Sequence, residues 1–131
     1  MTTLLLLVQI AAMPDARYLT QQALTYGVDP RVVLAIAWEE TRGNIDPRVR
    51  GAAHEIGRFQ LSPATARRAC PGLRVEQYHQ NVKCFFLVFI PLMVRYDLPG
   101  LLPANAIKRY NGRGPKADAY TRRVLKTVRE L

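Results

Sequence analysis

Signals for the start of a helix recur along this chain, and apolar residues follow them at helical spacing. Asp29-Pro30 pairs an N-cap residue with the proline favoured in a first helical turn, and apolar residues then recur every three or four positions until Gly43. Ser62-Pro63 repeats this start signal for a short helix that Pro71-Gly72 ends. No segment alternates apolar and polar residues for long enough to form a strand. We therefore expect an all-α fold.

Three further helices are expected downstream, over residues 74–96, 105–110 and 116–131. The first carries a face of phenylalanines that suits a core, and Pro91 is expected to kink it. Between Asn44 and Gly57 the sequence indicates only a small hairpin or an irregular flap.

The length and composition favour one domain over residues 1–131. The chain has 131 residues, of which 49% are hydrophobic, enough for one core. Residues 1–12 form an apolar N-terminal segment that lacks a preceding cation and is shorter than the ~20 residues of a spanning helix, so it makes at best a weak secretion signal. We expect residues 4–12 to belong to a packed N-terminal helix.

Basic residues outnumber acidic ones, 19 Lys and Arg against 10 Asp and Glu, which gives a net charge of +9. Such a chain favours polyanionic partners: nucleic acid, an anionic envelope polymer or an acidic surface. The cations near the C-terminus are expected to form a solvated helix face: Arg122, Arg123, Lys126 and Arg129.

The two cysteines leave two possibilities. Cys70 and Cys84 form either a disulfide, which would close a loop of about 15 residues, or two free thiols. Neither their spacing nor their neighbours suggest a metal site.

Glu40 is the strongest candidate for chemistry. It ends an apolar helical run beside Trp38, where partial loss of hydration should raise its pKa and let it act as a general acid near neutral pH. Gln60, Tyr110 and Asn111 add the aromatic and amide groups that a polysaccharide groove requires. Cleavage of a glycosidic bond needs a proton donor and hydrogen bonds that hold the sugar.

These residues also carry a family resemblance. Glu40-Thr41, the segment Gly57-Arg58-Phe59-Gln60 with its following Pro-Ala-Thr-Ala, Tyr110-Asn111-Gly112 and Tyr120 occur in the order seen in soluble lytic transglycosylase domains. The chain resembles that branch of the lysozyme-like superfamily over about residues 23–128. The resemblance implies a lysozyme-like helical fold with at most a small hairpin or flap.

The resemblance also implies an activity. Glu40 would cleave the bond between N-acetylmuramic acid and N-acetylglucosamine in peptidoglycan as the single acid and base, leaving a 1,6-anhydro ring, with no metal or cofactor. Thr41 would support the orientation of the acid. The remaining matched residues would bind substrate: Gly57, where the backbone approaches the sugar or turns sharply, Phe59, Gln60, Tyr110, Asn111 and Tyr120.

The chain departs from the family pattern in two places. Arg58-Phe59 replaces Leu-Met, and the stretch between Glu40 and Gly57 is longer by about two residues. This longer stretch contains Glu55, where animal-type lysozymes carry their second carboxylate. Glu55 leaves a hydrolysing muramidase open as an alternative, with water as the attacking group.

Several residues have plainer interpretations. Glu39 points about 100° away from Glu40 on a helix, so we expect an exposed charge or an ion pair with an arginine. Glu55 could form a salt bridge in its loop, with Arg50 or Arg58. Surface or structural roles are expected for the remaining polar and aromatic candidates: Trp38, His54, Tyr78, His79 and Asn81.

Two other classes of function remain. A small basic helical protein could bind nucleic acid, although no basic recognition helix of a helix-turn-helix pair is evident. A peptidoglycan-binding module without activity is the second, although it would not require the acid and the groove amides. Under the favoured hypothesis the partners are peptidoglycan glycan strands and the anionic wall surface, with no nucleic acid. The protein would act as a monomer in the cell envelope, in the periplasm or outside the cell, or be carried by a phage.

Overall fold

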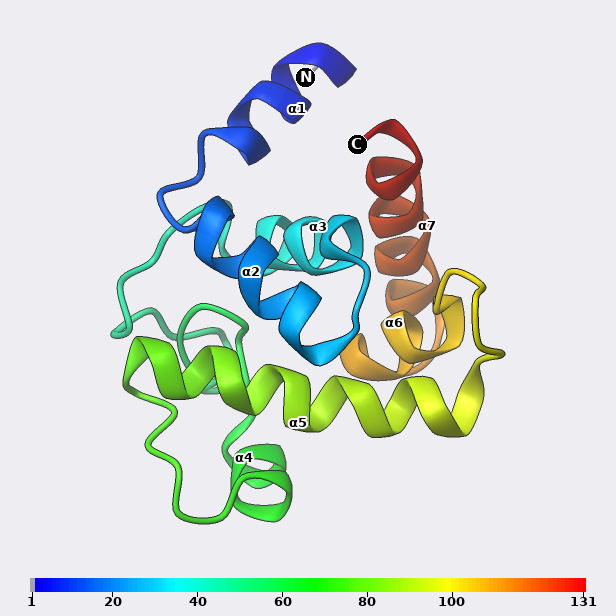
Figure 1. The fold of residues 1–131 in the computed structure, drawn as a ribbon. Coiled ribbons are helices and arrows are strands. Elements are labelled where there is room, and N and C mark those ends of the chain that lie inside the picture. Colours follow the sequence, from blue (N-terminus) through cyan, green and yellow to red (C-terminus); the bar gives the residue numbers. More distant parts are fainter. Residues whose placement is uncertain (1) are drawn as a thin grey trace.

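Helices make up most of residues 2–131, the part of the chain that the computed structural model describes (Figure 1). Seven helices occur in this part: α1 (Thr3–Ala11), α2 (Ala16–Tyr26), α3 (Pro30–Thr41), α4 (Pro63–Ala69), α5 (Tyr78–Tyr96), α6 (Ala104–Asn111) and α7 (Pro115–Glu130). The same residues contain no strand. The all-α prediction is therefore confirmed.

The predicted helix starts at Asp29 and Ser62 are also confirmed. The Asp29 carboxylate accepts a hydrogen bond from the Arg31 amide, with Pro30 in the first turn of α3. The Ser62 hydroxyl accepts one from the Thr65 amide at 3.1 Å and caps α4. Each side chain satisfies an amide that a helix start leaves without a partner inside the helix.

The start of α5 was predicted too early. The helix begins at Tyr78 rather than Arg74, because the preceding turn uses its backbone groups elsewhere. The Arg74 amide donates to the Gln80 side chain at 2.6 Å, and the Val75 carbonyl accepts from Asn81 Nδ2 at 2.9 Å. These bonds replace the first helical turn that the sequence suggested. The helix then runs through Pro91 to Tyr96.

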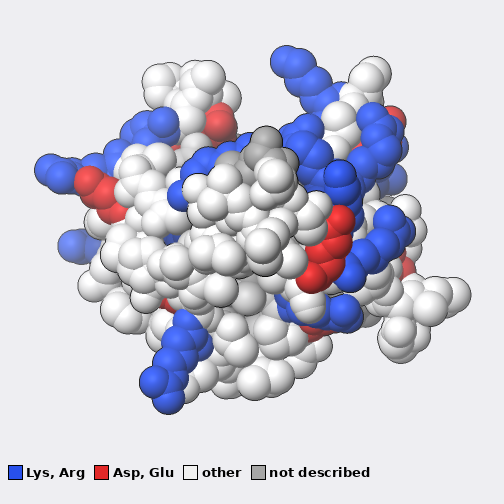
Figure 2. Space-filling view, turned by 90° about the horizontal axis from the view of Figure 1, so that it is seen from above, with Lys and Arg blue, Asp and Glu red and all other residues white. Residues whose placement is uncertain are grey.

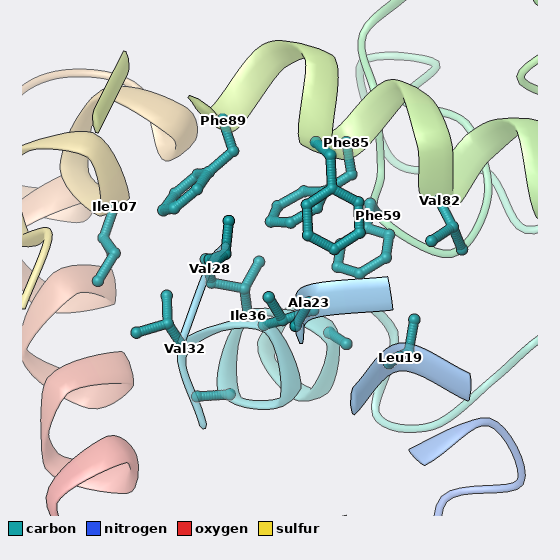
Figure 3. Packing of buried hydrophobic residues seen from close by; sticks show 14 of the residues in the cluster. Leu19, Ala23, Val28, Val32, Ile36, Phe59, Val82, Phe85, Phe89 and Ile107 are labelled. Atoms are coloured by element: carbon teal, nitrogen blue, oxygen red, sulfur yellow. The ribbon is translucent and has the colours of Figure 1, made fainter. Parts of the chain in front are cut away.

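A single hydrophobic core joins α5 to the helices around it. The fully buried rings of Phe85 and Phe89 on α5 face α3 and α6, and the ring of Phe59 stacks on Phe85 with centroids 4.1 Å apart (Figure 3). Val32 and Ile36 of α3 fill the space between them. Trp38 is also in the core, 8% exposed, as expected.

The N-terminal segment forms a helix, as expected, but this helix is only partly packed. In α1, Ile10 is fully buried, whereas Leu4 and Val8 are 73% and 56% exposed. The prediction of a packed helix is therefore wrong for the outer face of α1. Among the described residues, no helix is long and apolar enough to cross a membrane.

The segment between α3 and α4 is the irregular flap that the sequence indicated. Two isolated antiparallel bridges, Arg50 with Ile56 and Ile56 with Leu61, hold it together. The Ile56 and Leu61 backbones exchange hydrogen bonds of 2.8 and 3.1 Å, which fold residues 57–60 into a tight turn. This turn carries the Gly-Arg-Phe-Gln motif.

Of the two possibilities for the cysteines, the structure has the disulfide. Cys70 at the end of α4 is bonded to Cys84 in α5, with Cα atoms 5.7 Å apart. In the chain-entropy model, a loop of this length contributes about 3 kcal/mol to the stability of the fold. The bond fastens α4 to α5 along one wall of the candidate site.

Candidate active site

A groove of about 800 Å³ runs between the end of α3, the flap, and helices α4 to α7. It brings together five of the polar residues singled out in the sequence: Glu40, Glu55, Gln60, Tyr110 and Asn111, with Tyr120 beside them. Its lower wall is apolar and comes from α5: Leu87, Val88, Pro91 and Leu92. Residues from six separate segments therefore meet in one hollow.

Glu40 lies in the last turn of α3, where its carboxyl group is largely removed from water. Burial raises the pKa of this group from 4.5 to about 7, and the negative charges of Glu39 and Glu55 act in the same direction. The Tyr120 hydroxyl donates a hydrogen bond to Glu40 Oε1 at 3.1 Å, which opposes the rise. Burial outweighs that bond, so the acid is half protonated near pH 7.

Two tyrosines, Tyr110 and Tyr120, form hydrogen bonds at this acid and at the flap next to it. Burial raises the pKa of both Tyr110 and Tyr120 well above 10, so both hydroxyls remain donors. Tyr110 donates to the Phe59 carbonyl at 2.5 Å and packs its ring edge-on against Phe85. Tyr110 thus ties α6 to the flap, while Tyr120 on α7 contacts the acid itself. The direct hydrogen bond to Glu40 therefore comes from Tyr120 and not from Tyr110.

Glu39 forms the arginine pair that the sequence suggested. Its carboxylate accepts from Arg123 Nε at 3.1 Å and lies 3.5 Å from Arg42 Nη1. Its side chain is only 7% exposed, so the expectation of an exposed charge is wrong. The two cations lie against Glu39, and Glu40, whose pKa is raised to about 7, is the carboxyl group of this pair that can hold a proton near neutral pH.

Glu55 and Gln60 meet over Gly51 on the flap side of the groove. A Cβ atom placed on Gly51 would lie 2.3 Å from Glu55 Oε2 and 2.6 Å from Gln60 Oε1, so glycine leaves the space that both side chains occupy. Glu55 Oε1 accepts from the Ala53 amide at 2.8 Å, and Gln60 Nε2 donates to the Gly57 carbonyl at 2.9 Å. Glu55 forms no salt bridge with Arg50 or Arg58 within the described residues.

A buried ion pair under the groove was not foreseen from the sequence. Arg58 is 1% exposed, and its guanidinium binds both carboxylate oxygens of Asp15, at 2.8 and 3.1 Å. The same guanidinium donates to the Ala37 carbonyl and to Thr41 Oγ1, and the Tyr78 hydroxyl donates to Asp15 at 2.5 Å. Arg58 therefore fastens the flap to the end of α3 and to the start of α2.

The structure consequently changes the role expected for Thr41. Its hydroxyl accepts from Arg58 and donates to the Arg58 carbonyl at 3.1 Å, and it does not line the groove. Thr41 acts on Glu40 only through the end of α3 that it anchors.

Two further expectations about the flap need correction. Phe59 cannot bind substrate through its ring, which is fully buried against Phe85. Gly57 does turn sharply, with φ of +69°, but the group that lies close to it is Asn81. A Cβ atom on Gly57 would meet Asn81 Nδ2 at 2.7 Å. Asn81 is 1% exposed; its side chain donates to the Ile56 carbonyl and accepts from the Phe59 amide. These two bonds hold the turn of residues 57–60 in place.

Three arginines that were not foreseen from the sequence also line the groove: Arg68, Arg109 and Arg123. Arg109 lies 4.4 Å over the ring of Tyr96. For Arg123 a signal existed, because it follows Tyr120 by three positions and so shares its helix face. The two histidines, in contrast, are exposed, as expected.

Comparisons with protein-family models, with curated proteins and with solved structures give no match. Residues 2–131 also contain no group of three His, Cys, Asp or Glu side chains placed to hold a metal ion.

The raised pKa of Glu40 predicts a pH-dependent stability. Between about pH 4.5 and 7 this group is protonated in the folded chain and ionised in the unfolded chain. Folding then takes up a proton, so stability falls as the pH rises through that window, by about 3 kcal/mol in total. Glu40→Gln removes the effect. In urea unfolding, the stability of the variant relative to the parent should increase as the pH rises through this window. If the two proteins gave parallel curves of stability against pH, the assignment would be wrong.

Proposed function

We propose that this protein is a peptidoglycan lytic transglycosylase with a lysozyme-like fold, and that Glu40 is its catalytic acid and base. The observation that carries the proposal is a carboxyl group with a pKa of about 7 inside a groove of about 800 Å³. A general acid works best when its pKa lies near the working pH. The resemblance of the surrounding motifs to soluble lytic transglycosylases supports the choice of substrate.

In the proposed reaction Glu40 gives up one proton and later takes up another. It first gives its proton to the glycosidic oxygen of N-acetylglucosamine as the bond from that oxygen to C1 of the muramic residue breaks. The oxocarbenium-like centre at C1 is then attacked by the 6-hydroxyl oxygen of the same muramic residue. Glu40, now ionised, takes the hydroxyl proton as the 1,6-anhydro ring closes. The acid is restored without any added cofactor.

The groove offers suitable contacts for glycan strands. The amides of Gln60 and Asn111 can bind hydroxyl and N-acetyl groups, and the apolar wall formed by Leu87 and Pro91 can lie against a sugar face. Tyr120 keeps Glu40 oriented through its 3.1 Å hydrogen bond. The net charge of +9 would draw the enzyme to anionic wall polymers, an attraction that salt weakens. Its place of action would then be the cell envelope, or a phage that enters or leaves it.

A hydrolysing muramidase is the second candidate, and Glu55 is the reason to keep it. Glu55 lines the same groove, and its charge acts on Glu40. We favour the transglycosylase because Glu55 is bound to the backbone of its own exposed loop through the Ala53 amide. Closure of the internal ring needs no second carboxylate, whereas hydrolysis uses one, either to activate water or to form a covalent intermediate.

Glu55→Gln separates these two candidates. A transglycosylase should clear purified cell walls within a few-fold of the parent rate, because cyclisation uses Glu40 alone. A muramidase should lose about 10²-fold or more, as is usual when a catalytic carboxylate is removed. The measurement is the loss of turbidity of a wall suspension, with and without a chelator. Loss of clearing in Glu55→Gln would overturn the transglycosylase in favour of the hydrolase.

A further inference from the structure

Helix α1 presents apolar side chains to solvent and turns its one amide side chain inward. Leu4, Leu5 and Val8 are 73%, 49% and 56% exposed. Apart from Thr3 in the first turn, every exposed residue of α1 is apolar. Gln9 faces the protein instead, and its Oε1 atom is buried with no hydrogen-bond partner among the described residues. This orientation is the reverse of what an aqueous surface favours.

Cations flank this apolar face. Helix α7 packs beside α1, and its solvent side carries Arg122, Lys126 and Arg129, whose spacing places them along one stripe. None of the three forms an ion pair within residues 2–131. Glu130 is the one acidic residue in the last turn of α7. Figure 2, which views the molecule from the end where α1 lies in Figure 1, shows an uncharged surface bordered mainly by Lys and Arg side chains, with a few Asp and Glu side chains among them.

We propose that the outer face of α1 and the cationic stripe of α7 form a docking surface for an anionic lipid bilayer. The leucines and the valine would enter the boundary between headgroups and acyl chains, while the arginines and the lysine meet lipid phosphates. With nine residues, α1 is too short to cross a bilayer and would lie in its surface. No residue from Thr2 to Pro14 carries a side-chain charge that would resist this burial.

The charge of the protein favours a lipid surface over a second copy of the chain. A dimer through α1 would bring two cationic α7 stripes together, in a protein with a net charge of +9. The like charges of the two stripes would repel each other. An anionic bilayer instead neutralises the same cations and covers the apolar face in one step.

Docking through α1 would leave the groove accessible. In Figure 1, α1 lies at the opposite end of the molecule from α4, which lines the groove. If the proposed function holds, a lipid-bound enzyme would therefore hold its groove away from the bilayer and toward the wall. The docking surface itself does not depend on that function, and binding can be measured without any activity.

Flotation with phosphatidylcholine vesicles, with and without phosphatidylglycerol, tests the proposal. The whole chain should bind the anionic vesicles, bind neutral ones weakly, and be released as salt rises. Leu4→Ser/Leu5→Ser/Val8→Ser should weaken binding about 100-fold, from the lost apolar burial. Lys126→Gln/Arg129→Gln should weaken it roughly 25-fold, since each surface cation contributes about fivefold. The second variant changes only exposed side chains, so its folding is not in question.

A matched control uses three apolar residues that are at least as exposed but lie elsewhere. Val94, Leu98 and Leu101 are 80%, 71% and 65% exposed near the end of α5, and their triple change to serine should leave vesicle binding unaltered. Equal loss in the control triple would overturn the assignment to α1. So would the absence of binding to anionic vesicles, or a dimer in light scattering that the α1 variant converts to a monomer.

Discussion

Glu40→Gln should reduce the clearing of purified cell walls by about 10²- to 10⁴-fold, the range that a positioned general acid contributes. Glutamine has the same size and can still accept the hydrogen bond from Tyr120, now 3.1 Å from Glu40 Oε1. It cannot give a proton to the leaving oxygen. The variant should therefore fold and bind walls while failing to cleave them. The measurement is the initial rate of turbidity loss, together with wall pull-down.

Glu39→Gln is the matched control for this change. It makes the same change, from a carboxyl group to an amide, at the neighbouring residue and leaves Glu40 intact. The charge of Glu39 helps to raise the pKa of Glu40. Loss of this charge should therefore shift the pH profile of activity to lower pH without abolishing the activity. If Glu40→Gln cleared walls at the parent rate, or if Glu39→Gln were the inactive variant, Glu40 would not be the acid.

Arg58→Met should lower the free energy of unfolding by about 3–5 kcal/mol, the usual cost of leaving one member of a buried ion pair alone. Asp15 would keep a charge that is 7% exposed, with only the Tyr78 hydroxyl beside it. The turn of the flap would also lose the guanidinium bonds to Thr41 Oγ1 and to the Ala37 carbonyl, and would keep only the hydrogen bond from the Thr41 hydroxyl to the carbonyl of residue 58. Urea unfolding monitored by circular dichroism measures the effect.

The control for this prediction is an ion pair of similar chemistry on the surface. Arg48 binds Asp46 at 3.0 Å, but the Arg48 side chain is 88% exposed. Arg48→Met should therefore change stability by no more than about 1 kcal/mol. Asp15→Asn/Arg58→Met should recover part of the loss seen in Arg58→Met, because no buried charge is left unpaired. Equal effects of Arg48→Met and Arg58→Met would contradict a structural role for the buried pair.

Local signals explain what the sequence could predict of the fold. Asp29-Pro30 and Ser62-Pro63 begin helices through contacts two or three residues away, so their meaning is visible in the sequence itself. The phenylalanine face of α5 is likewise a matter of helical spacing. The start of α5 was misplaced because Asn81 Nδ2 donates a hydrogen bond to the Val75 carbonyl, a contact that a periodic pattern does not reveal.

The same distinction applies to the candidate site: features set by neighbouring residues could be predicted, and contacts between distant residues could not. Glu40 could be identified because it lies in the last turn of a helix whose apolar residues are buried, a position that the sequence reveals. The Asp15–Arg58 pair joins residues 43 positions apart, and nothing near either residue signals the other. Phe59 was assigned to the groove because it stands in the matched motif beside Gln60. In the structure Gln60 lines the groove, whereas the side chain of Phe59 is buried in the core. Motif order can indicate which segments meet, but the packing decides which side chains point inward.

Mass spectrometry of the glycan fragments, with digestion carried out in ¹⁸O-labelled water, tests the central claim most directly. We expect fragments that end in 1,6-anhydro-N-acetylmuramic acid and contain no ¹⁸O, because the sugar's own 6-hydroxyl is the proposed attacking group. Reducing ends that carry one ¹⁸O atom at C1 would show that water attacks, and would contradict the claim.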